Sequence, residues 1–121
     1  MEYQLSSDSD ALICVLYAEY LSRRSHGVPI CEACSFASNL SIHDSFVPEW
    51  PLEDVRSVLD WLCDHGLVAY LPGDDLCLDV TLTEEAIIYM EQRFTRKREL
   101  VLAHLKDLVS LGISVAGIIA H

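Results

Sequence analysis

Hydrophobic residues recur along this chain at two spacings, and the change of spacing marks where helices give way to strands. In the first run the apolar positions return every three or four residues, which predicts a helix with a broad buried face. Ser7, Asp8 or Ser9 should begin this helix. It should end near Arg24, because Gly27 follows. Its inward positions are Leu12, Ile13, Leu16, Tyr17, Tyr20 and Leu21.

A proline marks the start of a shorter second helix. Pro29 suits a helix start because its missing amide hydrogen costs nothing there. The helix should run from Ile30 to about Leu40, followed by a loop over residues 41–50 that contains Pro48. This loop is long for the turn of a helix-turn-helix, so we expect it to bulge. The positions expected to face inward are Ile30, Ala33, Cys34, Ala37 and Leu40.

The stretch from Pro51 to Gly66 predicts a third helix with two contrasting faces. Pro51 suits a first helical position, and Gly66 suits a left-handed C-cap. The apolar face comprises Leu52, Val55, Val58, Leu59 and Leu62. The other face carries Glu53, Ser57, Asp60 and Asp64, which fall together at helical spacing. We therefore expect an acidic outer face.

The spacing then changes to the alternation of strands. Residues 67–71 are short and apolar, and the turn sequence Pro-Gly-Asp-Asp at 72–75 follows them. Between 76 and 82, Leu76, Leu78, Val80 and Leu82 alternate with polar residues or cysteine. These two segments predict a β-hairpin. Thr83 is then placed to cap a further helix, whose first residues are acidic.

This order of helix, hairpin and helix resembles the second half of a bacterial winged-helix domain. The residues that carry the resemblance are His65–Val68, with the letters HGLV, and Leu82–Glu91, which begins LTEEA. The resemblance is to small winged-helix proteins of bacteria and their phages. It implies a mainly α fold with a small β-hairpin, in which the helix before the hairpin enters the DNA major groove and the hairpin tip touches the backbone.

The final helix should run from Glu84 to about Ala120, either continuously or with one break. We divide the chain into a winged-helix part, residues 1–94, and an apolar C-terminal helical extension, residues 95–121, within one domain. Near the boundary lies a basic patch formed by Arg93, Arg96, Lys97 and Arg98.

Beyond this patch, apolar and small residues follow the spacing of a helix that packs against another helix. They are Val101, Leu105, Leu108, Gly112, Val115 and Ile119. Two arrangements would cover them: the helix folds back on the first helix, or two copies form a homodimer through it. We expect the homodimer. The uncharged run at 108–120 is shorter than the roughly 20 residues that cross a bilayer, so no membrane span is expected.

The charge of the chain restricts its partners. The formal net charge is −11, from 19 acidic and 8 basic residues among 121. Such a chain repels nucleic acids and anionic membranes at long range and favours a basic partner. The first residues lack the pattern of a secretory signal, so we expect a cytoplasmic protein.

Cysteine and histidine positions give no clear metal or catalytic motif. Cys31 and Cys34 have the spacing of a zinc or redox pair, with His43, Cys63 and His65 as conceivable further ligands. No second pair of that spacing occurs, so we interpret the five cysteines as reduced core thiols. A nucleophile elbow, a phosphate loop and a paired-carboxylate motif are also lacking. We expect no enzyme activity, no metal and no cofactor.

These observations favour a protein-protein interaction module over a DNA-binding protein. The predicted partner-binding residues are Glu53, Asp60, Trp61 and Asp64 on the acidic helix, with Trp50 in the preceding loop. Alternatively, both tryptophans cap the core. The module would be an adaptor or an inhibitor of a basic, nucleic-acid-handling protein. The alternative function is a dimeric winged-helix transcriptional regulator that contacts DNA through the basic patch.

Overall fold

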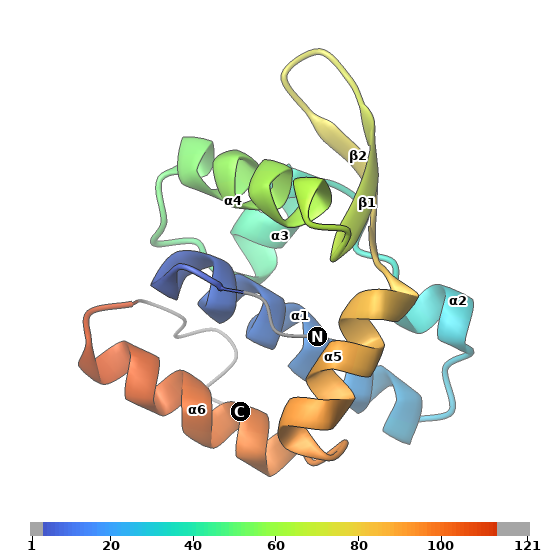
Figure 1. The fold of residues 1–121 in the computed structure, drawn as a ribbon. Helices are drawn as coiled ribbons and strands as arrows, with labels where there is room; N and C mark the ends of the chain where they lie inside the picture. The colour runs from blue at the N-terminus through green and yellow to red at the C-terminus, as the bar shows by residue number, and fades with distance from the viewer. Residues whose placement is uncertain (1–3, 114–121) are drawn as a thin grey trace.

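A helix whose middle segment is apolar on every side lies at the centre of the fold (Figure 1). The computed structural model describes residues 4–113, and this helix, α1, spans Ser7–Ser25. The Ser6 hydroxyl caps it by accepting a hydrogen bond from the Ser9 amide. Residues 11–18 are all fully buried. A helix segment that is hydrophobic all round must be covered on all sides. The spacing predicted one broad buried face, whereas the middle of α1 is buried on every side.

The region predicted as one helix over residues 30–40 is instead two short helices joined by an extended segment, so that prediction was wrong. They are α2 (Ile30–Ala33) and α3 (Asn39–Phe46). The Ser38 side chain caps α3, and Ala37 has a positive φ of 56°, which an α-helix does not allow. Consequently, α3 occupies much of the expected loop. Two positions expected to face inward, Ile30 and Leu40, are 55% and 40% exposed.

The third helix and the hairpin confirm the predicted mainly α fold with a small antiparallel sheet. Helix α4 spans Leu52–Asp64, with Pro51 as its N-cap. Strands β1 (Val68–Pro72) and β2 (Cys77–Leu82) then pair with each other. On its other side, β2 exchanges backbone hydrogen bonds with the segment between α2 and α3. The Phe36 amide donates to the Val80 carbonyl at 2.8 Å, and the Val80 amide donates to the Ala37 carbonyl at 3.0 Å.

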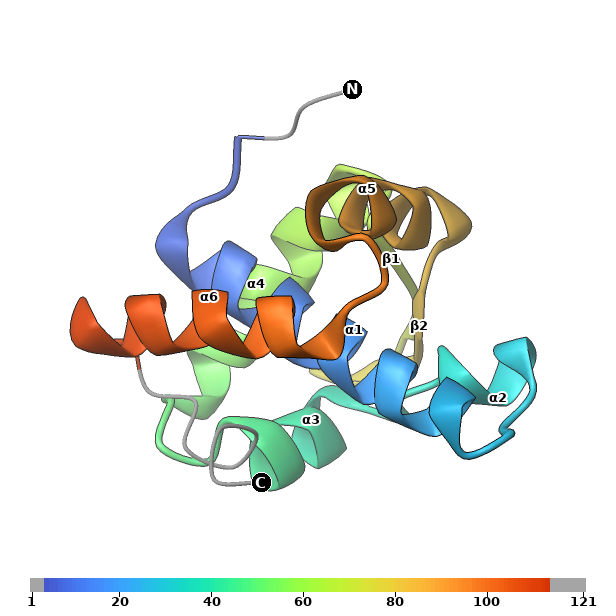
Figure 2. The same ribbon diagram turned by 90° about the horizontal axis from the view of Figure 1, so that it is seen from below.

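The predicted C-terminal helix is broken once, which is one of the two expected forms. Helix α5 spans Glu84–Phe94 and α6 spans Arg98–Ser110. The break falls at Thr95 and Arg96, which both have positive φ values, 51° and 62°. Helix α6 then turns back along α1 (Figure 2). In the described part of the chain, no helix has the length and apolar character needed to span a membrane.

The side chains predicted to form a dimer seam are covered within the chain. Val101 and Leu105 are fully buried and Leu108 is 6% exposed, in the core that includes α1. Gly112 lies just past α6 and is exposed, while positions 115 and 119 of the predicted seam lie outside the described residues. A dimer through these three buried side chains would require α6 to leave α1. The fold-back arrangement is therefore the one seen for the described part of the seam.

A half-buried charge cluster joins α1, α5 and α6. Arg93 donates two hydrogen bonds to the carboxylate of Asp10, at 2.6 and 3.3 Å, and His104 Nε2 lies 2.7 Å from the same carboxylate. Burial alone would raise the pKa of Asp10, but the hydrogen bonds from Arg93 and His104 outweigh it and lower that pKa. The prediction that Arg93 belongs to a surface patch is therefore corrected: its charge is used inside the fold.

Candidate protein-binding surface

The solvent side of α4 is acidic, as predicted. Glu53, Asp54, Ser57 and Asp64 are exposed, and Asp60 is half-buried. Glu53 and Asp54 lie in the first turn of α4, where negative charge interacts favourably with the helix dipole. From residue 52 to 82 the chain carries a single basic residue, Arg56. Its acidic residues over the same range are Glu53, Asp54, Asp60, Asp64, Asp74, Asp75 and Asp79.

The single arginine of this surface is already paired. Arg56 Nη1 donates to Asp75 Oδ1 at 3.1 Å and so links α4 to the turn of the hairpin. Because Asp75 holds this hydrogen bond, it raises the pKa of the guanidinium further above its ordinary value. A phosphate approaching α4 would therefore meet mainly carboxylates, and the one guanidinium there already has a carboxylate partner. The surface suits a positively charged ligand.

A second contact fixes the hairpin against α4. The Tyr70 hydroxyl donates a hydrogen bond to Asp60, and this bond raises the pKa of Tyr70 above its ordinary value. Asp60 was predicted to bind a partner, but here its carboxylate serves the contact with the hairpin. Glu53 and Asp64 have no polar contact with another described side chain, so they are the predicted acidic residues free to meet a partner.

The two tryptophans have different environments. Trp50 is only 9% exposed and belongs to the core, so the prediction that it anchors a partner from an exposed loop was wrong. The carbonyl oxygen of Trp50 lies 2.9 Å from His43 Nε2. Trp61 is half-buried and stacks on His65 with ring centroids 3.7 Å apart. It therefore presents part of an aromatic surface beside the acidic face of α4.

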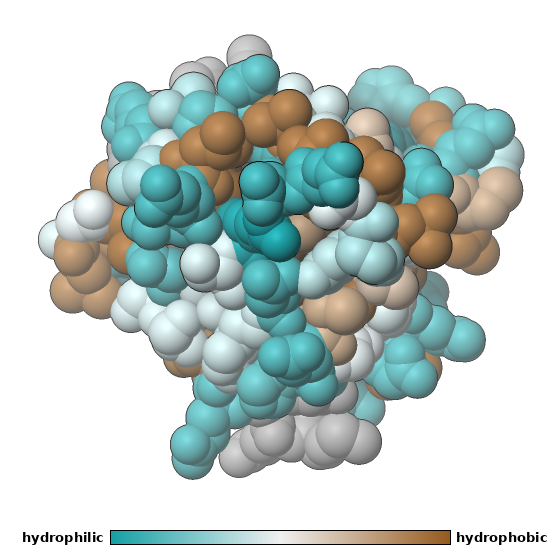
Figure 3. Space-filling view, turned by 90° about the horizontal axis from the view of Figure 1, so that it is seen from above, coloured by the Kyte–Doolittle hydropathy of each residue, from teal (hydrophilic) through white to brown (hydrophobic). Residues whose placement is uncertain are grey.

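Two exposed leucines on the hairpin were not predicted. Leu71 and Leu78 are register partners, and they are 59% and 38% exposed. The alternation of the sequence placed Leu78 on the buried side, but Asp79 has a positive φ of 51° and the pairing shifts register here. One extra residue in β2 reverses the alternation before Asp79, so Cys77 is buried in place of Leu78, whereas Val80 and Leu82 are buried as predicted. Figure 3 views the molecule from above relative to Figure 1 and shows hydrophobic and hydrophilic residues side by side on that face.

The predicted basic patch is not a continuous surface of free charges. Arg93 is bound to Asp10, and Arg96 donates to both carboxylate oxygens of Glu91, at 3.1 and 3.2 Å. Lys97 is exposed and Arg98 is half-buried. Half of the four predicted cations are therefore paired with carboxylates inside this chain.

Asp10, Cys14 and His104 bring together atoms of the types that ligate metals, all within 4.8 Å of one another. Asp10 and Cys14 lie one turn apart on α1, but His104 is 94 positions from Asp10, so this group could not be recognised from the sequence. Arg93 already supplies a cation to Asp10, and burial raises the pKa of Cys14 well above its usual value. Both facts oppose the formation of a thiolate-metal bond.

No protein-family model matches the sequence, and no curated protein or solved structure matches it either. The winged-helix resemblance therefore stays a prediction, carried by the order of helices and strands. What supports a function is the charge, exposure and contacts of the α4 surface.

Proposed function

We propose that this chain is a non-enzymatic protein-recognition module of the winged-helix type, which binds a basic partner. The binding surface is the outer face of α4, with Glu53, Trp61 and Asp64, together with the adjoining hairpin. Its role would be that of an adaptor or an inhibitor of a basic, nucleic-acid-handling protein. The observation that carries the proposal is the excess of acidic over basic residues between positions 52 and 82, where the single arginine, Arg56, also pairs with Asp75.

Electrostatics decide between a protein partner and DNA. A winged helix that inserts the helix before its hairpin into DNA gains affinity by neutralising phosphates with lysine and arginine. Here the same helix would place Glu53 and Asp64 against phosphates of like charge. A basic protein surface reverses the sign of this interaction and gains faster association as well.

The rival function, a DNA-binding regulator that uses the basic patch, is weaker for a similar reason. Arg93 and Arg96 would have to leave Asp10 and Glu91 before they could contact phosphates. Breaking the half-buried pair with Asp10 would also leave that carboxylate without its main partner. Only Lys97 and Arg98 of the basic patch would then be available to contact phosphates, and two cations provide little affinity for DNA.

A cytoplasmic location is part of the proposal. Cys14, Cys31, Cys34, Cys63 and Cys77 are all free thiols. Proteins kept in a reducing compartment retain free thiols, whereas secreted proteins of this size tend to oxidise theirs to disulfides.

The test compares two charge-matched double variants of the full chain. Glu53→Gln/Asp64→Asn neutralises the proposed surface, and Glu99→Gln/Asp107→Asn removes the same charge from the exposed side of α6. The probe is a fluorescent arginine-rich peptide, with a mixed-sequence DNA duplex as competitor, and binding is followed by anisotropy. We expect the α4 variant to weaken peptide binding roughly three- to tenfold and the α6 variant to leave it unchanged.

Two outcomes would reject the proposal. Equal losses in both variants would mean that the peptide senses net charge alone. A duplex that binds the native chain more tightly than the peptide, and is released by neutralising Arg96, Lys97 and Arg98, would establish the DNA-binding function instead.

A further inference from the structure

A small cavity lies beside the C-terminal end of α1, and none of its lining residues belongs to α4 or the hairpin. It has a volume of about 170 Å³. Its walls come from α1, from the extended segment after α2, and from α3. The lining residues are Arg23, Ser35, Phe36, Ala37, Ser41, Ser45 and Phe46. None of these side chains is acidic, although the chain as a whole has a net charge of −11.

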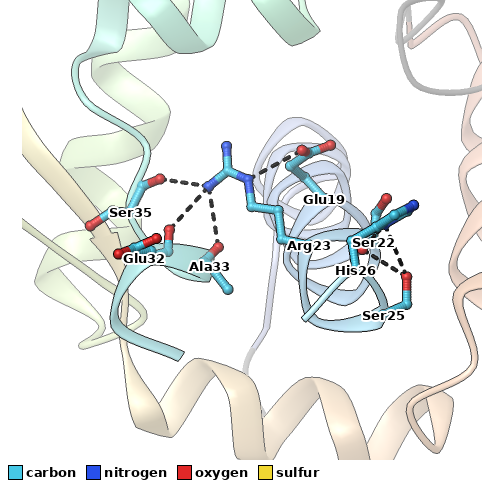
Figure 4. A network of polar contacts seen from close by, with 8 residues as sticks. All are labelled: Glu19, Ser22, Arg23, Ser25, His26, Glu32, Ala33 and Ser35. Carbon is cyan, nitrogen blue, oxygen red and sulfur yellow. Dashed lines mark hydrogen bonds and ion pairs between the residues drawn. The ribbon is translucent and has the colours of Figure 1, made fainter. Parts of the chain in front are cut away.

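Arg23 is held in one orientation at this cavity (Figure 4). Its Nε donates to Glu19 at 3.2 Å, and its Nη1 donates to the carbonyls of Ala33 and Ser35 at 3.2 and 2.7 Å. The guanidinium also packs over the Phe36 ring, 4.6 Å from its centroid. In contrast, Nη2 donates to no other described residue, and Figure 4 shows it directed away from the carbonyls. One arginine nitrogen is thus fixed in place with its hydrogens available.

The other polar side chains that line the cavity are serines, whose hydroxyls can form further hydrogen bonds. Ser41 and Ser45 lie one turn apart on α3, so their side chains share a face. Neither hydroxyl forms a hydrogen bond within the described part of the chain. Phe36 and Phe46 form an edge-to-face pair at 6.1 Å and supply an apolar wall. The cavity therefore combines a directed guanidinium nitrogen, hydroxyl donors and an aromatic surface.

We propose that this cavity binds a monocarboxylate that carries a short apolar group. The carboxylate would accept hydrogen bonds from Arg23 Nη2 and from the hydroxyls of Ser41 and Ser45, with the apolar group against the two phenylalanines. Charge-assisted bonds of this kind are the strong ones. Glu19 offsets the charge of Arg23, so a single negative charge suits the site better than a phosphate dianion.

The size of the cavity limits the ligand. Drug-sized ligands occupy pockets of roughly 300–1,000 Å³, so this cavity accepts a smaller molecule or one residue of a longer one. The same chemistry is offered by a free organic acid and by the C-terminal carboxylate of a peptide. Benzoate and N-acetylalanine represent these two sources, and benzamide is the neutral analogue of benzoate.

The experiment follows amide chemical shifts of the full chain by two-dimensional NMR during titration with each compound. We expect benzoate, N-acetylalanine or both to give saturable shifts at Ser35, Ser41 and Ser45, and benzamide to give none there. Inorganic phosphate is titrated in parallel. If benzoate and N-acetylalanine leave these amides unshifted, if benzamide shifts them equally, or if phosphate binds there more tightly, the proposal is wrong.

Variants test which groups bind the carboxylate. Removing both hydroxyls in Ser41→Ala/Ser45→Ala should weaken binding at least roughly tenfold, while Ser57→Ala, an exposed helical serine on α4, should have no effect. Arg23→Gln should abolish binding, but it also removes the bonds that hold α2. Glu19→Gln separates these effects: it should tighten binding, because it removes a competing negative charge, and a damaged fold cannot produce that result. Unchanged or weaker binding in Glu19→Gln would contradict the proposal.

Discussion

His104 Nε2 and a carboxylate oxygen of Asp10 lie 2.7 Å apart, although 94 positions separate the two residues. Asp10 is near the start of α1 and His104 is in the middle of α6, so this contact joins opposite ends of the chain. Arg93, near the end of α5, binds the same carboxylate. A cluster in which one acid serves two bases from two other helices fixes where α6 lies on the fold.

Removing the shared acid should destabilise the fold. In Asp10→Asn, Arg93 and His104 lose their common partner in a half-buried site, and we expect the free energy of unfolding to fall by about 2–3 kcal/mol. Asp8→Asn is the matched control, because Asp8 is exposed in the first turn of α1 and should cost less than about 1 kcal/mol. Denaturant unfolding of both variants measures the difference. Similar losses would show that the helix dipole, and not the cluster, is what matters.

The same residue predicts how stability depends on pH. The pKa of Asp10 is lower in the folded chain than its ordinary value of 3.8. A lowered pKa means that the ionised acid favours folding, so its contribution is present above the unfolded pKa and is lost as pH falls through the folded pKa. Between about pH 5 and pH 2, the native chain should therefore lose more stability than Asp10→Asn. Parallel curves from denaturant titrations over this range would contradict the assignment.

The contact between hairpin and helix gives a third prediction. Tyr70→Phe keeps the ring but removes the hydrogen bond to Asp60, and it should cost about 1 kcal/mol. Hydrogen exchange at the amides of β1 should become faster. Arg56→Gln breaks the exposed pair with Asp75 and should leave exchange nearly unchanged, because surface ion pairs contribute little. Faster exchange in Arg56→Gln than in Tyr70→Phe would reverse this ranking.

The parts of the fold that could be predicted from the sequence are those in which periodicity and capping agree. For α1 and α4, the apolar spacing, the first residues and the final glycine all indicate the same limits. The hairpin follows from its alternation and from the turn at 72–75. These signals come from residues close together in the sequence, so tertiary packing does not alter the helices and strands that they predict.

Prediction failed where a single backbone angle decides the outcome. Ala37 and Asp79 adopt positive φ values without being glycine, and because non-glycine residues rarely do so, the sequence does not mark the end of a helix at Ala37 or an extra residue in the strand at Asp79. The surroundings of Arg93 were likewise missed, because its partner Asp10 lies 83 positions away in the sequence. The burial of Trp50 was missed because it depends on how the segment before α4 packs on the core. Of the candidate site, the acidic face of α4 was predictable from spacing, whereas the cavity at Arg23 depends on the unpredicted extended segment.

The last prediction distinguishes a folded-back α6 from a homodimer formed through it. Leu105 is fully buried and Leu100, one and a half turns earlier on the same helix, is 44% exposed. Leu105→Ala should therefore cost about 2–5 kcal/mol, and Leu100→Ala should be close to neutral. If α6 covers its own chain, the melting temperature of the native protein will not change with protein concentration. An obligate dimer would melt at higher temperature as concentration rises, and its elution volume would increase in Leu105→Ala because the subunits separate.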